Sequence, residues 1–112
     1  MTEHELQNSI IQYLELKKFY VMRLNSGVIP SFYKGKQRMI RLSKKGTPDL
    51  MAFSKKQNAM SIWNLKLIFI ELKVPGKNAE PEQIEMMKEL ERFGAKCVVI
   101  HSITELQELL GI

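Results

Sequence analysis

Cysteine and histidine are scarce in this 112-residue sequence, and it has no long apolar run. The single cysteine, Cys97, cannot form an internal disulfide, and one cysteine with two histidines is too few for the usual zinc sites. No apolar stretch approaches the roughly 18 residues of a membrane span, and the start does not resemble a signal peptide. We therefore expect a cytoplasmic protein without a membrane partner.

Acidic residues are nearly absent from the middle of the chain. Residues 17–66 contain twelve Lys and Arg but a single acid, Asp49, whereas the segments on both sides are net acidic. The formal net charge of +5 therefore conceals a strongly basic centre, which favours a polyanion such as a nucleic acid as partner. A lysine-rich surface that is only solvated is the alternative.

The apolar pattern predicts one domain, residues 1–112, of the α/β class: a mixed central β-sheet flanked by helices. The predicted order is helix, four strands, helix, strand, helix. Residues 28–36, which include Pro30 and Gly35, are predicted to form a loop or a loose hairpin turn. Helices are predicted at about 3–18, 81–93 and 103–110. Strands are predicted at about 19–24, 37–42, 49–53, 67–73 and 97–100.

Asp49 interrupts the basic segment where a turn, Gly46-Thr47-Pro48, meets a strand. Glu71 and Lys73 end the most apolar strand, and strand alternation places both on one face. Neighbouring strands can bring Glu71 beside Asp49. Two carboxylates and a strand carbonyl, that of Leu72, form an oxygen site suited to a hard divalent ion such as Mg²⁺. A surface ion pair between Glu71 and Lys73 is the alternative.

With these residues, the chain resembles the PD-(D/E)xK nuclease superfamily and, within it, the compact VRR-NUC domains of phages and prophages. The resemblance covers nearly the whole chain. It is carried by Glu3 with Leu6-Gln7, Arg23 to Gly27, Gly46 to Leu50, Phe69 to Lys73, and Gln83. It implies a restriction-endonuclease-like core and a Mg²⁺- or Mn²⁺-dependent DNA endonuclease, akin to Holliday-junction resolvases.

The resemblance also implies roles for individual residues. Asp49, Glu71 and the Leu72 carbonyl would be the metal ligands. Lys73 would position or activate the attacking water and stabilise charge that develops on the phosphate. The metal would polarise the phosphate and lower the pKa of its bound water.

Two further residues, Glu3 and Gln83, are assigned by the resemblance to the surroundings of the metal. Glu3 resembles the acid of the first helix, which supports the metal shell, and Glu5 is its competitor. Helical spacing favours Glu3, because it shares a face with Leu6 and Ile10 and is therefore expected to point at the sheet, while Glu5 has the capping role after Thr2. Gln83 resembles the glutamine of the helix that follows the catalytic strand.

Basic residues of the central segment are expected to contact DNA phosphates as a group. They are Lys34, Lys36, Arg38, Arg41, Lys44 and Lys45. Arg23 and Asn25 are further candidates for holding phosphate near the site, with strand-end solvation as the alternative. Phe32 and Tyr33 are interpreted as core or subunit packing, with stacking on unpaired bases as the alternative. Trp63 is interpreted as a hydrophobic plug before the catalytic strand.

These observations predict a divalent-metal-dependent endonuclease that cuts branched DNA such as Holliday junctions. Selectivity for DNA shape is favoured because a minimal domain has no module that reads sequence. A two-fold homodimer suits a symmetric four-way junction, with residues 28–40 and the Trp63 segment as candidate interfaces. The alternatives are a monomeric flap-type or non-specific nuclease, and a DNA-binding protein without catalysis. A helicase or replication partner is compatible with the sequence but not indicated by it.

Overall fold

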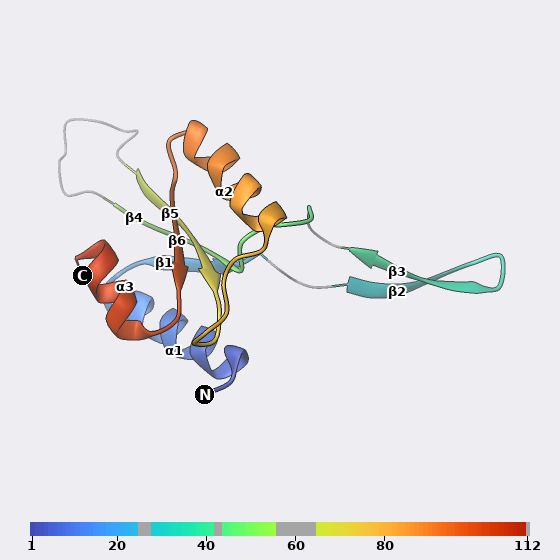
Figure 1. Ribbon diagram of the computed structural model, residues 1–112, viewed down its shortest axis with the longest axis horizontal. Coiled ribbons are helices and arrows are strands. Elements are labelled where there is room, and N and C mark those ends of the chain that lie inside the picture. Colours follow the sequence, from blue (N-terminus) through green and yellow to red (C-terminus); the bar gives the residue numbers. More distant parts are fainter. Residues whose placement is uncertain (25–27, 42–43, 56–64, 112) are drawn as a thin grey trace.

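The structure, a computed structural model, describes residues 1–24, 28–41, 44–55 and 65–111 (Figure 1). The predicted α/β class, a mixed sheet flanked by helices, is confirmed. The elements in chain order are α1 (Glu3–Leu16), β1 (Tyr20–Arg23), β2 (Val28–Tyr33), β3 (Lys36–Arg41), β4 (Leu50–Lys55), β5 (Leu65–Leu72), α2 (Pro81–Arg92), β6 (Lys96–Ile100) and α3 (Ile103–Leu110).

The main sheet has the strand order β1-β4-β5-β6. β4 runs antiparallel to both β1 and β5, whereas β5 and β6 are parallel. A parallel pair needs a crossover connection, and α2 provides it. The apolar run Leu67-Ile68-Phe69-Ile70 lies in β5, the strand between β4 and β6, as its composition predicted.

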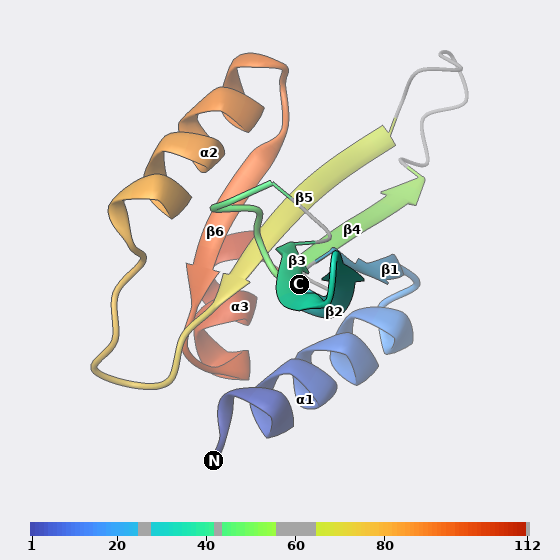
Figure 2. The ribbon, with the colours of Figure 1, turned by 90° about the vertical axis from the view of Figure 1, so that its right-hand side faces the viewer.

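Two helices, α1 and α3, cover one face of the sheet, and α2 lies on the other (Figure 2). The aliphatic core is on the α1–α3 side. It includes Ile10, Ile68, Ile70, Leu72 and Leu106, each fully buried. Because side chains alternate along a strand, the residues of β5 between these, Phe69 and Glu71, face α2 instead. Glu71 is therefore placed outside the aliphatic core although it belongs to the central strand.

The predicted N-terminus of α1 is confirmed, because the Thr2 hydroxyl accepts a hydrogen bond from the Glu5 N–H at 3.1 Å. Its C-terminus comes two residues earlier than predicted. Lys18 adopts a left-handed conformation with φ of +70°, which cannot continue a right-handed helix. This turn leads directly into β1.

The segment 28–36, predicted as a loop or loose hairpin turn, instead contributes a strand, β2, that pairs with β3 in a separate two-stranded sheet. Among the described residues, five strands rather than the predicted four therefore precede α2. Lys34 and Gly35, with φ of +51° and +74°, form the tight two-residue turn that matches the twist of a hairpin. Pro30 is tolerated in β2 because each strand of a two-stranded ribbon keeps one edge without a partner strand.

The β2–β3 ribbon projects from the main sheet along the longest axis of the molecule, which measures 56 Å against 34 and 25 Å for the other two (Figure 1). Figure 2 looks along the ribbon toward the main sheet. Residues 56–64, which contain the expected turn and Trp63, lie outside the described residues. Among the helices that the structure describes, none is both long and apolar enough to cross a membrane.

Candidate active site

Asp49 and Glu71 lie side by side at the ends of two adjacent strands. Leu50 pairs with Ile70 in the β4–β5 register, so Asp49 is opposite Glu71 at the next position, on the face that carries α2. Both carboxylates are buried, with 8% and 3% of their surfaces exposed. The Leu72 N–H donates a hydrogen bond to Asp49 Oδ2 at 2.8 Å. The juxtaposition expected from the two strand ends is thus present.

The carboxylate of Glu71 is only partly satisfied by its neighbours. Its Oε2 accepts a hydrogen bond from Gln83 Nε2 at 2.9 Å and lies 3.6 Å from Lys73 Nζ. Its Oε1 is buried and has no hydrogen-bond partner among the described residues. Burial, followed by repulsion from Asp49, raises the pKa of Glu71 from 4.5 to about 8, although Lys73 opposes the shift. The positive charge of Lys73 is therefore too small to keep both buried carboxylates ionised at neutral pH.

Lys73 approaches the carboxylates from the same strand. It follows Glu71 by two residues and so emerges on the same face. Its N–H donates to the Ile100 carbonyl at 3.1 Å, which continues the β5–β6 pairing beyond the end of β5. The side chain is 15% exposed, so its ammonium stands between the buried Glu71 and solvent.

Gln83 joins the first turn of α2 to the site. Its Oε1 accepts the Glu80 N–H at 2.7 Å, and this bond leaves its Nε2 to donate to Glu71. The resemblance implied Gln83 at this place. Its hydrogen bond with the Glu80 N–H was not predicted, although the spacing Glu80-x-x-Gln83 matches a capping box, in which the side chain of the third helical residue reaches back to the N-cap backbone.

Gly46 lies in the turn before Asp49 and allows this turn to approach the first turn of α2 closely. A Cβ built on Gly46 would collide with the backbone carbonyl of Glu82, and the φ of Gly46 is +85°. Only glycine meets both conditions without strain. Close backbone contact therefore fixes α2, and with it Gln83, relative to Asp49.

Glu3 does not point at the sheet as expected. Leu6 and Ile10 of the same helix are buried, but the Glu3 side chain is exposed. Glu3 is the first residue of α1 and precedes the turns that pack on the sheet. Within the described parts of the chain, no three acidic, His or Cys side chains are grouped to hold an ion, so Glu3 is not grouped with Asp49 and Glu71 as a direct ligand. Its support of the metal shell through water stays a prediction.

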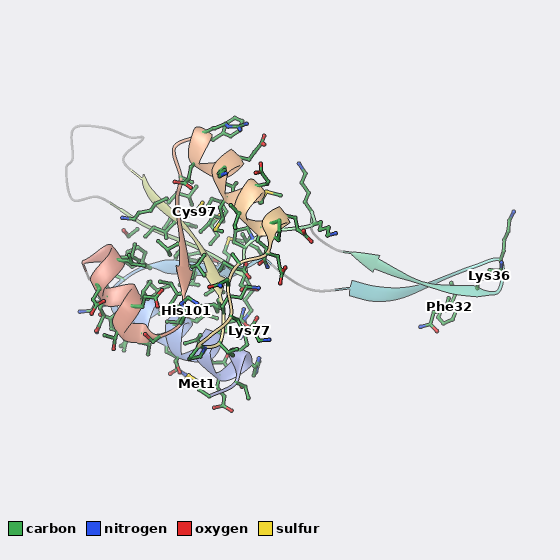
Figure 3. The ribbon with its side chains drawn as sticks, in the orientation of Figure 1. Met1, Phe32, Lys36, Lys77, Cys97 and His101 are labelled. Atoms are coloured by element: carbon green, nitrogen blue, oxygen red, sulfur yellow. The ribbon has the colours of Figure 1, made fainter. Side chains whose placement is uncertain are left out.

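The basic residues expected to bind DNA lie in three places. Arg23 ends β1 near the site, where its Nη2 donates to Asn8 Oδ1 at 2.9 Å. Lys34 and Lys36 are exposed at the far end of the β2–β3 ribbon, where Figure 3 labels Lys36. Lys44 and Lys45 are exposed beside α2. Asn25 and the side chains of Arg38 and Arg41 lie outside what the structure describes.

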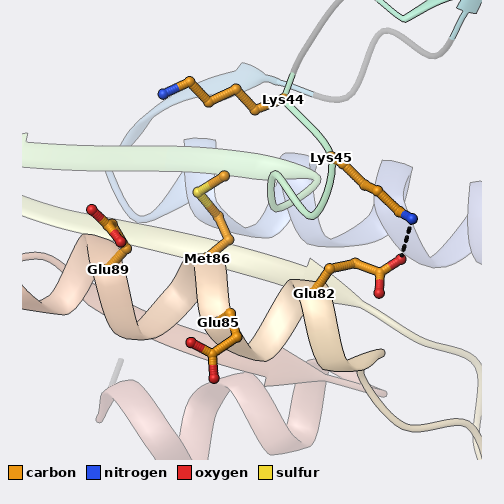
Figure 4. A pocket seen from close by; sticks show the side chains of 6 residues that line it. All are labelled: Lys44, Lys45, Glu82, Glu85, Met86 and Glu89. Atoms are coloured by element: carbon orange, nitrogen blue, oxygen red, sulfur yellow. Dashed lines mark ion pairs between the residues drawn. The ribbon is translucent and has the colours of Figure 1, made fainter.

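An open pocket of 470 Å³ lies between Lys44, Lys45 and one side of α2 (Figure 4). Three glutamates of α2, Glu82, Glu85 and Glu89, contribute to its lining, and Lys45 Nζ is 3.2 Å from Glu82 Oε1. This ion pair is largely exposed and therefore weak. Three carboxylates repel a phosphate backbone, so this side of α2 is a poor path for DNA.

Two comparisons with known proteins agree with this description. The family model of the VRR-NUC domain matches residues 2–103. A solved structure described as a VRR_NUC domain superposes with a TM-score of 0.63 at 19% identity, covering 97% of this chain and 94% of that one. A search of curated proteins found no match.

The structural match shows a mixed α/β fold, and the family model assigns the chain to a class of nuclease domains, whose substrate is DNA. The chain belongs to the VRR-NUC domain family.

Proposed function

We propose that this chain is a divalent-metal-dependent endonuclease that hydrolyses phosphodiester bonds of branched DNA. The observation that supports metal-dependent catalysis most strongly is the unpartnered Oε1 of Glu71 beside Asp49. A buried carboxylate oxygen without a partner is costly, and a bound cation removes that cost. The same cation would offset the burial and repulsion that raise the pKa of Glu71.

The residues fit Mg²⁺ or Mn²⁺, which prefer oxygen ligands. Asp49, Glu71 and the carbonyl of Leu72 would hold the ion. The Leu72 N–H points at Asp49, and in a strand the N–H and C=O of one residue point the same way, so its carbonyl is directed to the side where Asp49 lies. When bound, the ion supplies Lewis-acid polarisation of the phosphate and acidifies its coordinated water.

Lys73 and Gln83 both contact Oε2 of Glu71 and have different parts in the reaction. Gln83 holds Glu71 Oε2, which keeps Oε1 directed away from α2 and available as a ligand. Lys73 places a positive charge between Glu71 and solvent. There it can stabilise the negative charge that develops on the phosphate during hydrolysis. In the same position Lys73 can orient the attacking water.

Selectivity for branched DNA, such as a Holliday junction, follows from the chemistry of the surface. Among the described elements, no helix-turn-helix or zinc module reads sequence, whereas exposed lysines on the ribbon can follow backbone geometry. A homodimer with two sites would cut a symmetric junction twice. A bacterial or phage-infected cell would be its setting.

The test is a four-way-junction cleavage assay with the wild type and Asp49→Asn, in Mg²⁺, in Mn²⁺ and in EDTA. We expect cleavage by the wild type with either metal, none in EDTA, and none by the variant, which should still bind the junction. Normal cleavage by Asp49→Asn would show that the site is elsewhere.

Two outcomes would favour the alternatives. A single nick on flaps, together with a monomeric mass in solution, would replace the dimeric junction nuclease by a flap-type enzyme. Binding of branched DNA without cleavage in Mg²⁺ or Mn²⁺ would favour a non-catalytic DNA-binding protein.

A further inference from the structure

The β2–β3 ribbon is inserted in the chain between two segments of the candidate active site. Arg23, the last residue of β1, pairs with Leu50, and the Leu24 N–H donates to the Asp49 carbonyl at 2.9 Å. The chain therefore leaves the main sheet next to Asp49 and returns to it through Gly46. With six residues in each strand, the ribbon reaches about 20 Å from its base.

The far end of the ribbon exposes an aromatic side chain among basic residues. Phe32 is 72% exposed and lies near the tip, on the strand opposite Gln37 and close to Lys36 (Figure 3). Packing of Phe32 in the core of this chain, as the sequence suggested, is therefore wrong. Residues 28–41 contain four Lys and Arg and no acid. A two-stranded ribbon is marginally stable in water by itself, so one that exposes Phe32 is suited to a partner.

Charge decides which partner fits. Two copies of the ribbon placed against each other would bring eight like charges together, which opposes a dimer built from ribbons. A polyanion is complementary to the same charges. A two-stranded ribbon also fits the major groove of duplex DNA.

We infer that the ribbon is a DNA-probing arm, and that Phe32 stacks on a base exposed at a branch point. This inference rests on the proposed function, because it assumes that the substrate reaching Asp49 is branched DNA. Inserting an aromatic ring into a continuous duplex requires a base step to open, whereas a branch point already exposes the face of a base pair. Phe32 thereby favours branched over linear DNA without reading sequence.

The length of the arm also limits where the cut falls. Phe32 lies eight residues beyond Leu24, whose N–H bonds to Asp49, so if Phe32 marks the branch and Asp49 the cut, the two points are at most about 30 Å apart, or about nine base pairs along a duplex. Cuts are therefore expected within about nine base pairs of the branch.

The test compares Phe32→Ala with Phe93→Ala, a matched control, because Phe93 is also exposed but lies at the opposite end of α2 from Gln83. Binding to a four-way junction and to a linear duplex of equal length is measured by fluorescence anisotropy in EDTA. We expect Phe32→Ala to weaken junction binding about tenfold, to leave duplex binding unchanged and to be rescued by Phe32→Trp. Phe93→Ala should bind both as the wild type does.

A second measurement reports the stacking directly. A 2-aminopurine at the branch should be quenched by the wild type and by Phe32→Trp, but not by Phe32→Ala. Circular dichroism establishes that each variant is folded, which is expected because Phe32 contacts no part of the core. Unchanged junction selectivity or unchanged quenching in Phe32→Ala would overturn the inference. A shift of Phe32→Ala from dimer to monomer without DNA would also overturn it, since Phe32 would then be a subunit contact.

The outcomes separate this inference from the proposed function. Binding of the junction through Phe32 without cleavage in Mg²⁺ or Mn²⁺ would refute the nuclease and support the arm. Metal-dependent cleavage with the same junction preference in wild type and Phe32→Ala would support the nuclease and refute the arm.

Discussion

The raised pKa of Glu71 predicts that the metal-free protein becomes less stable as the pH rises. In the folded state Glu71 holds its proton up to about pH 8, whereas in the unfolded chain it loses it near 4.5. The folded state therefore binds more protons between these values, and its stability falls as the pH rises through this window toward 8. Replacing Glu71 by Gln removes this proton and with it the dependence.

The size of the effect follows from the two pKa values. Between about pH 6 and about pH 8.5, this one group should lower the free energy of unfolding by about 2.5 kcal/mol. Urea titrations followed by circular dichroism, in EDTA, would measure it in the wild type and in Glu71→Gln. The difference between the two proteins isolates Glu71, because both retain His101 and Cys97, whose pKa values are also raised.

Glu85→Gln is the matched control, since Glu85 is an exposed glutamate of α2 whose partner, Lys88, is also exposed. It should keep the pH dependence of the wild type. At about pH 8.5, Mg²⁺ at a hundred times its dissociation constant should stabilise the wild type by about 2.7 kcal/mol and leave Glu71→Gln nearly unchanged. Equal pH dependence in the wild type and Glu71→Gln would refute the account of the site given above.

Three further predictions concern the surroundings of Glu71 and the DNA surface. Lys73→Met should lower the cleavage rate by about 10²- to 10⁴-fold with little loss of junction binding, measured by single-turnover kinetics and anisotropy. Gly46→Ala should lower the free energy of unfolding by about 1–3 kcal/mol and slow cleavage, because its Cβ pushes the first turn of α2 away; Gly76→Ala, whose Cβ meets no neighbour, controls for the positive φ alone. Lys36→Ala should reduce the slope of log K against log salt for DNA binding by about 1, and an unchanged slope would show that Lys36 contacts no phosphate.

Local patterns in the sequence predicted most of the fold. The N-cap at Thr2, the apolar run of β5 and the start of α2 at Pro81 each depend on neighbouring residues, and each was correctly placed. The ribbon was underestimated because Pro30 argues against a strand in general, although not against one with an edge that lacks a partner strand. Its turn, Lys34-Gly35, lacks the asparagine or aspartate that usually signals this geometry.

The main residues of the candidate site could be predicted because they lie at the ends of strands, and residue positions along a strand follow from the sequence. Asp49 precedes one strand and Glu71 ends its neighbour, so their meeting required only that the strands be adjacent. Exposure of Glu3 could not be predicted in this way, since it depends on where the first turn of α1 stands relative to the sheet. The unpartnered Oε1 of Glu71 and the contact of Gly46 with α2 likewise arise from three-dimensional packing.

The position of the ribbon in the chain has a consequence for how such a domain can diverge. β1 and β4 pair with each other directly, from Tyr20 with Phe53 to Arg23 with Leu50, and the ribbon is an excursion between them. β1 ends and β4 begins at paired positions, Arg23 and Leu50, so the length and sequence of the ribbon can vary while the strand pairing beneath it stays the same. If the ribbon is the DNA-probing arm inferred above, exchange of this insertion between relatives would transfer substrate preference and leave Asp49, Glu71 and Lys73 in place.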